Sequence, residues 1–266
     1  MTSREFVLGV LENIVATLPL VVAGAISGWL SRYLYERRGV RRIFNLPHPR
    51  VHIVLGTPLY ITPGTNRTRK SSGVPMATIG TVFAYQSVVN LLQRGYPHLR
   101  NIGFYFSQDF PAGFYGDNLI LIGFPKTNRV TNDVFERLRP PVVFDGHQLV
   151  EQATGQRFTA KLAEGVRVVE DYGCFVRARN PYNPESVVLV LAGSQTYGMK
   201  AAADYLDSVC LSGGRLRGRL SMLILRRRPA GSASRTLESV HCQVVLKVHV
   251  ERYFTSSPEV VAQFSL

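Results

Sequence analysis

Two continuous apolar segments, Asn118 to Ile122 and Val187 to Leu191, constrain the fold of this chain more than any other feature of its sequence. Each reads as a strand buried on both faces, followed by a turn of small and polar residues and then by a helical pattern. Strands that alternate with helices favour a sheet with helices on both faces. We therefore predict an α/β fold for residues 50–266, a three-layer Rossmann-like sandwich with a mainly parallel sheet and some antiparallel strands at its edge.

The rest of the chain supplies shorter elements around these two units. Val51 to Gly56 is a good first strand, and a helical pattern runs from about Pro75 to Gly95, where a Gly-Tyr-Pro sequence ends it. Between them lies a long polar loop, Thr57 to Val74, and loops of this length in compact domains are often functional. Asn101 to Phe106 reads as a short strand. The alternation in Val240 to Val250 predicts an edge strand with one wet face.

The N-terminal segment carries no charged residue from Asn13 to Ser31. At about 1.5 Å per residue, a helix of this length spans roughly 28 Å, close to the hydrocarbon thickness of a bilayer. Trp29 then lies where an interfacial aromatic residue belongs. We therefore predict one N-terminal transmembrane anchor (residues 1–35), a basic linker (residues 36–49) and the α/β domain (residues 50–266).

Two other interpretations of the N-terminal segment stay open. Ala23-Gly24-Ala25 resembles a signal-peptide cleavage site, although no positively charged region precedes it, and the segment also suits a buried helix of a soluble domain. For an anchor, the flanking charges set the orientation. Only Arg4 lies on the N-terminal side, whereas residues 32–50 hold six arginines. The positive-inside rule then predicts a single-pass membrane protein with its C-terminal domain in the cytoplasm.

Gly24 and Gly28 form a G-x-x-x-G pattern inside this segment. Small residues on one face of a helix let two helices approach closely. The motif is short and common, so Gly24 and Gly28 are a candidate contact for a homodimer, and the absence of self-association stays an alternative.

The chain is basic, with a formal net charge of +13. Such a charge suits nucleic acid or an anionic membrane surface as a partner. However, only five of the 31 basic residues are Lys, and an arginine bias of this kind also follows from genomic base composition. Many of the arginines flank the predicted anchor, so nucleic-acid binding is not favoured. A second basic cluster is interpreted as a solvated sheet edge; it consists of Arg215, Arg217, Arg219 and Arg226 to Arg228.

The sequence contains no recognisable pattern for metal binding or catalysis. Cys174, Cys210 and Cys242 are far apart and odd in number, which predicts neither a disulfide framework nor a zinc site. They are interpreted as buried apolar residues of a chain in a reducing compartment. The histidines are scattered singly, and neither a G-x-S-x-G nor an H-E-x-x-H motif occurs. Catalytic residues, metal ligands and cofactors are therefore not assigned.

The candidate site lies in the two turns that follow the apolar strands. Glycine allows close backbone approach, hydroxyls and amides donate hydrogen bonds, and a helix N-terminus favours an anion. In open α/β sheets, ligands bind at the carboxyl ends of the parallel strands, where both turns are expected. Neither turn matches the P-loop or the dinucleotide fingerprint, so purely structural turns stay an alternative. The predicted ligand-binding residues are Gly123, Lys126, Thr127 and Asn128 in the first turn, and Gly193, Ser194, Gln195, Thr196 and Gly198 in the second.

The two units also carry a resemblance to a known family. The segments I-L-I-G-F-P-K-T-N-R-V-T (residues 120–131) and V-L-V-L-A-G-S-Q-T-Y-G-M-K-A-A-A (residues 188–203) resemble the paired strand–loop–helix units of S-layer-like C-terminal domains. In that family a Gly-Pro turn with Asn and Thr is followed later by an Ala-Gly turn and an Ala-rich helix. Phe124 stands here where the family usually has a second Gly. The resemblance implies an α/β fold and an extracellular location, and it carries over no catalytic residue.

Three functional hypotheses follow from the sequence. The first is a membrane-anchored cytoplasmic binding or sensor module for a small anionic ligand such as a nucleotide, held at the two turns. The second is an enzyme that acts on a nucleotide or a sugar-nucleotide through the same turns. The third, implied by the resemblance, is an exported structural domain of the cell envelope. A fold alone does not separate these classes.

Overall fold

The structure is a computed structural model in which most of the chain is described. The described residues are 3–57, 77–165, 167–211, 241–251 and 254–266, with side chains described from residue 21 onward. Segment 58–76 includes most of the polar loop predicted over residues 57–74. Segment 212–240 includes the second basic cluster, so both features lie outside the described residues.

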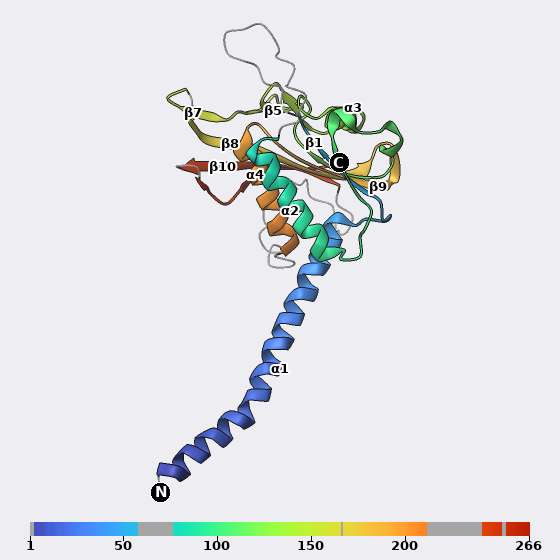
Figure 1. Ribbon diagram of the computed structural model, residues 1–266. Helices are drawn as coiled ribbons and strands as arrows, with labels where there is room; N and C mark the ends of the chain where they lie inside the picture. Colours follow the sequence, from blue (N-terminus) through green and yellow to red (C-terminus); the bar gives the residue numbers. More distant parts are fainter. Residues whose placement is uncertain (1–2, 58–76, 166, 212–240, 252–253) are drawn as a thin grey trace, which may run out of the picture.

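One large sheet forms the centre of the molecule (Figure 1). Four of its strands are parallel to one another and adjacent, in the order β9-β3-β1-β2. The other described strands of this sheet join β9 in antiparallel pairings, in the order β11-β10-β8, with β12 on β10 and β7 on β8. The bounds are β1 Val51–Leu55, β2 Ile102–Phe106, β3 Asn118–Ile122, β7 Lys161–Ala163, β8 Arg167–Asn180, β9 Asn183–Gly193, β10 Cys242–Glu251, β11 Phe254–Thr255 and β12 Glu259–Ser265.

The sheet is mixed, and most of its pairings are antiparallel, so the predicted Rossmann-like sandwich with a mainly parallel sheet is wrong. The reason is local. Parallel neighbours need a crossover connection of a dozen or more residues, whereas a tight turn returns the chain beside itself in the opposite direction. Asn180 and Asn183 pair across such a turn, which makes β8 and β9 a hairpin. The segment Val240 to Val250, predicted as an edge strand, corresponds to β10, which has β8 on one side and β12 on the other.

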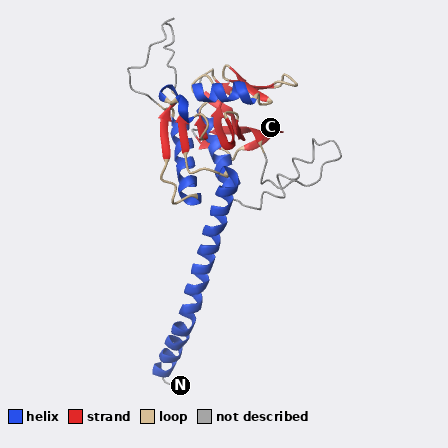
Figure 2. Cartoon of the chain, turned by 90° about the vertical axis from the view of Figure 1, so that its right-hand side faces the viewer, coloured by secondary structure: helices blue, strands red, loops and turns tan. Residues whose placement is uncertain are grey.

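Helices lie on both faces of the large sheet (Figure 2), and each face has its own hydrophobic core. On one face lie α2 (Ile79–Gly95), α4 (Thr196–Leu211) and the C-terminal end of α1 (Ser3–Phe44). On the other lie α3 (Arg129–Leu138) and a small sheet of β4 (Val142–Asp145), β5 (Gln148–Glu151) and β6 (Arg157–Phe158). Two short 3₁₀ turns, η1 (Ser107–Asp109) and η2 (Ala112–Phe114), join β2 to β3.

Strand β3 shows why a continuous apolar run occurs here. Ile120 and Ile122 belong to the core under α2 and α4, whereas Leu119 and Leu121 belong to the core under α3. All four side chains are at most 1% exposed. Because successive side chains of a strand point to opposite faces, a strand covered on both faces needs apolar residues at every position.

The last turns of α1 are part of the core of the domain. Val40 and Phe44 are fully buried, although residues 36–44 were predicted to belong to a basic linker. The guanidinium of Arg177, itself buried on β8, donates a hydrogen bond of 2.6 Å to the carbonyl of Ile43 near the helix end. Such a bond satisfies one of the carbonyl groups that the end of a helix leaves without an intrahelical partner.

In the part of the chain that the structure describes, we find no helix with the length and apolar character needed to cross a membrane. This finding overturns the predicted anchor over residues 13–31, together with the single-pass membrane localisation and the cytoplasmic placement that depended on it. Helix α1 runs on as a single helix to Phe44, past the end of the predicted span at Ser31.

Two glycines of α1 provide a matched test of its docking. A Cβ at Gly39 would overlap the carbonyl oxygen of Cys210 on α4, whereas a Cβ at Gly28 would meet nothing within 4 Å. Gly28→Ala is expected to be neutral or to stabilise by up to about 1 kcal/mol, through helix propensity. Gly39→Ala is expected to lower the free energy of unfolding by about 1–3 kcal/mol, because overpacking forces the helices apart. Chemical denaturation of both variants measures the difference; equal stability would show that α1 does not dock closely on α4.

Candidate functional site

The carboxyl ends of β1 and β3 are adjacent, and the segments that follow the two strands lead to opposite faces of the sheet. The chain after β1 leads to α2 on one face, and the chain after β3 leads to α3 on the other. The two exits are joined by backbone hydrogen bonds, from Gly56 N to the Ile122 oxygen at 2.7 Å and from Thr57 N to the Thr127 oxygen at 2.8 Å. Such a switch point is the usual place for a ligand in an open α/β sheet.

The first predicted turn, Gly123 to Asn128, is held by close backbone contacts. Gly123 has a φ of +126°, which favours glycine, and a Cβ there would lie 3.2 Å from the Cα of Gly56. The Thr127 hydroxyl donates to the carbonyl of Phe124 at 3.1 Å. Of the predicted ligand-binding residues in this turn, only Lys126 has an exposed side chain.

The side-chain amide of Asn128 has a structural role, and both its nitrogen and its oxygen are hydrogen-bonded within the chain. Its Nδ2 donates to the carbonyls of Val54 at 3.0 Å and Ile122 at 3.2 Å, which lie on adjacent strands. Its Oδ1 accepts from the backbone N–H of Thr131 at 3.1 Å and so caps the N-terminus of α3. Asn128 is fully buried, so its side chain does not face a ligand.

The second predicted turn, Gly193 to Gly198, already holds an anion. Asp171 is a fully buried residue of β8, and its carboxylate accepts hydrogen bonds from the backbone N–H groups of Gly198 at 2.5 Å and Tyr172 at 2.8 Å. Burial raises the pKa of Asp171 to about 6, while backbone hydrogen bonds from Gly198, Tyr172, Gln195 and Tyr197 act to lower the pKa. The N-terminus of α4 therefore binds the chain's own carboxylate where a ligand anion was predicted.

The glycines of this second turn allow close packing. A Cβ at Gly193 would overlap the backbone N of Met199, and one at Gly198 would overlap the carbonyl oxygen of Tyr172. Gly193, Ser194 and Gly198 are buried, while Gln195 is exposed and Thr196 is half-buried. The two predicted turns are neighbours, because Gly123 N donates to the carbonyl of Leu191 at 2.9 Å. Their helices nevertheless run on opposite faces of the sheet.

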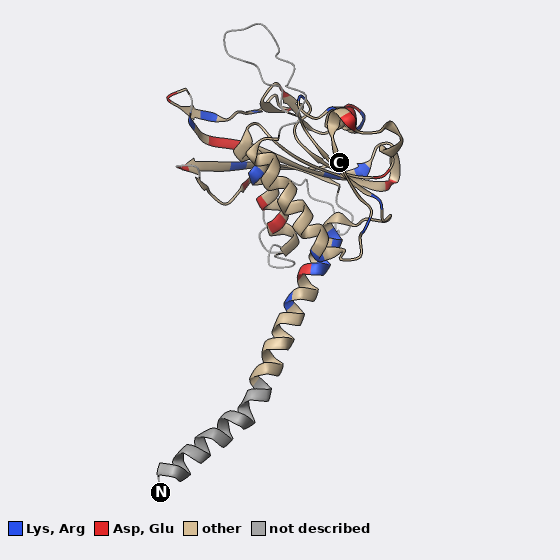
Figure 3. Ribbon diagram, in the orientation of Figure 1, with Lys and Arg blue, Asp and Glu red and all other residues tan. Residues whose placement is uncertain are grey.

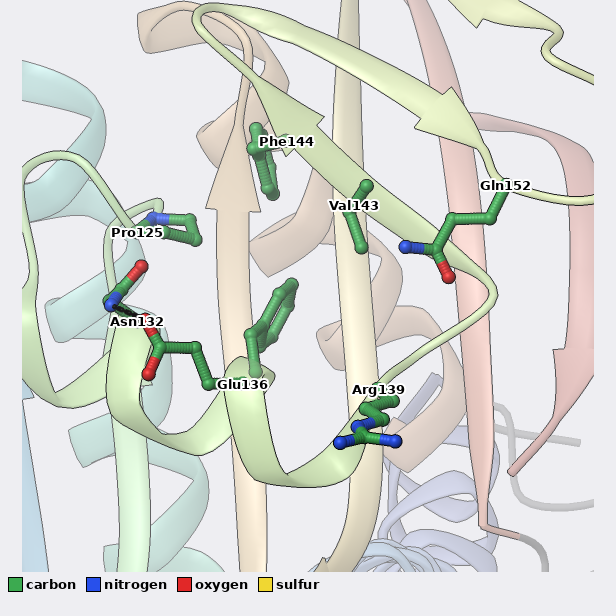
Figure 4. Close-up of a pocket in the computed structure, with 8 residues that line it drawn as sticks. Pro125, Asn132, Glu136, Arg139, Val143, Phe144 and Gln152 are labelled. Carbon is green, nitrogen blue, oxygen red and sulfur yellow. Dashed lines mark hydrogen bonds between the residues drawn. The ribbon is translucent and has the colours of Figure 1, made fainter.

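A groove beside the first turn offers a more open site. It lies between α3 and the β4–β5 hairpin and has a volume of about 360 Å³, within the range of small-molecule sites. Figure 4 shows the side chains of Val143 and Phe144 on the hairpin, with polar side chains around them, and Phe135 adds to the apolar lining. The lining residues are Pro125, Asn132, Phe135, Glu136, Arg139, Val143, Phe144 and Gln152.

The polar rim of this groove carries both charges. Asn132 donates from Nδ2 to Glu136 Oε1 at 2.7 Å, one turn apart on α3 (Figure 4). Arg139 is the C-cap of α3, with a left-handed φ of +48°. The exposed Arg139 guanidinium makes no hydrogen bond or ion pair with the described residues. The sequence analysis did not predict that these residues form a site. The one sequence feature near them is Pro140-Pro141, which ends the helix just after Arg139.

A pair of a buried histidine, His52, and a half-buried aspartate, Asp117, lies at the opposite end of the strands, at the amino ends of β1 and β3. His52 Nε2 and Asp117 Oδ2 are 2.9 Å apart, and the His52 ring stacks on Phe114 with centroids 4.6 Å apart. The other ring nitrogen, Nδ1, has no hydrogen-bond partner in the described structure. A Cβ at Gly103 would lie 2.5 Å from that nitrogen, so β2 leaves no room for a substrate there. We therefore interpret the pair as part of the core.

Comparisons with known proteins give no assignment: no family model and no curated protein matches the chain. Within the described residues, no group of three or more His, Cys, Asp or Glu side chains is placed to hold a metal ion. Cys174 and Cys210 are buried and free, and Cys242 is half-buried and free.

The buried Asp171 predicts a specific pH dependence of stability. Because the pKa of Asp171 is raised from 3.8 to about 6, the folded chain binds this proton more tightly than the unfolded chain. Its contribution to stability is therefore complete below about pH 4 and is lost as the pH rises through about 6. In Asp171→Asn this fall should disappear. Urea unfolding at a series of pH values from 4 to 7 measures it, and parallel curves for wild type and variant would contradict the assignment.

The neighbouring Glu170 does not confuse this test. Burial alone would raise its pKa, but hydrogen bonds from Lys247, Lys161 and Tyr172 lower the pKa of Glu170 to about 2. Its contribution is present above about pH 4.5 and is lost as the pH falls from there towards 2. It therefore overlaps the window used for Asp171 only at the acid end, where it changes with pH in the opposite direction and is common to wild type and variant.

Proposed function

We propose that the chain is a binding module for a small anionic ligand that carries a flat or apolar part, such as a nucleotide, and that the ligand lies in the groove beside α3. The groove itself supports this proposal: about 360 Å³ of space with an apolar floor and a polar rim. Sites for small molecules are usually concave, mostly apolar and furnished with a few placed polar groups.

Each part of the groove suits one part of such a ligand. Phe135 and Phe144, whose ring centroids are 6.4 Å apart, offer apolar surface to a ring. Arg139 suits a phosphate or a carboxylate, because its planar guanidinium donates two parallel hydrogen bonds to such groups. The Glu136 carboxylate accepts from ligand N–H or O–H groups. Lys126 follows Pro125 of the groove wall, and its exposed side chain adds positive charge to that end.

The side chains that line the groove also favour binding over catalysis. In the described residues that line it, the ionisable side chains are Glu136 and Arg139, and no nucleophile stands beside a base. A catalytic site needs a nucleophile or an acid–base group within hydrogen-bond reach of the reacting atom. The chemistry of the lining residues is that of recognition.

Arg139→Asn tests the proposal with little disturbance of the fold. Asn tolerates the left-handed conformation that Arg139 adopts, so the helix cap is kept while the charge is removed. Thermal-shift screening of nucleotides and sugar phosphates, followed by calorimetry of any hit, gives the affinity. We expect Arg139→Asn to raise the Kd by about tenfold or more, the usual effect of losing a charged hydrogen bond.

Arg129→Asn on the same helix is the matched control, because Arg129 does not line the groove. Its Kd should stay at the wild-type value. Equal affinities for all three proteins would place the ligand elsewhere, and no binding across the panel by a folded protein would reject the proposed function. Turnover of a bound ligand would show that the module is an enzyme.

A further inference from the structure

Among the described residues, the sheet ends at β2, an edge strand without a charged side chain, a proline or a bulge. Within the described residues β2 pairs only with β1, so its outer row of backbone N–H and C=O groups has no strand beside it. Natural edge strands are usually guarded by charged side chains, proline or a bulge. The β2 sequence, I-G-F-Y-F, contains no charge and no proline, and its register with β1 is continuous.

An apolar surface continues from this edge onto α2. Phe104 of β2 is 46% exposed, and its ring lies 5.2 Å from that of Tyr85 on α2. On the outward side of α2, Ile79, Val82 and Phe83 are 68%, 52% and 52% exposed. Single exposed apolar residues are common on proteins, but a contiguous set marks an interaction surface. We call the surface formed by Ile79, Val82, Phe83, Tyr85 and Phe104 the α2–β2 edge.

The outward side of α2 also lacks charge. The chain has a net charge of +13, yet α2 contains no charged residue before Arg94 in its last turn (Figure 3). The exposed polar positions in its middle are the amides Gln86 and Asn90, which are hydrogen-bonded to each other at 3.0 Å. A solvated helix face normally carries charged residues, so this one has the composition of a covered face.

These features together select the partner. In a two-fold symmetric interface, residues near the axis meet their own copies. Apolar side chains and amides are compatible with their own copies, because an amide both donates and accepts, whereas a charge would meet the same charge. A two-fold axis normal to the sheet also places the two β2 strands antiparallel and brings both α2 helices together on the same face.

We propose that a second copy of the chain docks on the α2–β2 edge. The two β2 strands then pair antiparallel and continue the sheet from one protomer into the other, and the α2 helices pack across the axis. The groove beside α3 lies on the other face of the sheet, so this association does not depend on the proposed ligand.

Sedimentation velocity of the full chain tests the proposal directly, with Phe83→Glu and the milder Gln86→Lys as interface variants. The matched control is Phe254→Glu, because Phe254 on β11 is 79% exposed and distant from this edge in the sheet order. We expect wild type and Phe254→Glu to sediment as dimers, and the two interface variants to have a dimer Kd at least about tenfold higher. Far-UV circular dichroism spectra that match the wild type would show that the variants are folded.

Any of three results would overturn the proposal. The wild-type chain would be monomeric at every concentration tested, or the dimer would persist unchanged in both interface variants. In the third, Gly24→Ile would dissociate the dimer and Phe83→Glu would not. The last result would move the contact to α1, where a Cβ at Gly24 meets no other atom within 4 Å in the single chain.

Discussion

The buried carboxylate of Asp171 at the start of α4 is the interaction on which the arrangement of this domain depends. It links β8 to the N-terminus of α4 by hydrogen bonds to backbone N–H groups on both elements. Around it Gly173, Gly193 and Gly198 allow backbones to approach at distances that any side chain would prevent. Helix α4, fixed in this way, then packs against α2 and the end of α1, which completes the core on that face. A charge is tolerated in this interior because several N–H dipoles point at it.

This interaction also shows how a sequence pattern typical of ligand binding can serve packing within the chain. A glycine-rich turn at a helix N-terminus attracts an anion by the same physics whether the anion is a phosphate or a side chain. Asp171 lies 27 residues before Gly198, so only the fold brings the two together. In the first turn, the amide of Asn128 is likewise consumed by two carbonyls and a helix cap. Both turns are therefore built for close packing, and the open space lies beside α3.

The parts of the fold that local pattern determines were predictable. Asn118 to Ile122 is β3, Val187 to Leu191 lies within β9, and Gly95 ends α2 as the Gly-Tyr-Pro sequence indicates. The direction of the strands was not predictable, because it depends on how the segments between the strands connect them. The short turn at residues 180–183 sets β8 antiparallel to β9, and the C-terminal strands extend the antiparallel half. The prediction of a membrane anchor in the N-terminal segment was wrong for a related reason. A lack of charge does not show how far a helix continues, and α1 continues until its end packs in the domain core. The groove was missed because its walls come from a helix end and a hairpin that meet only in the fold.

The most direct test of this account follows the backbone amide of Gly198 by ¹H–¹⁵N NMR. If Asp171 fills the N-terminus of α4, the Gly198 resonance should titrate with the ionisation of that carboxylate near pH 6. At neutral pH it should stay unchanged when phosphate or a nucleotide is added, while the amides of Asn132 and Arg139 respond to a ligand in the groove. A Gly198 amide that shifts on addition of phosphate or a nucleotide, and shows no titration near pH 6, would mean that the turn binds ligand anions and that Asp171 does not occupy it.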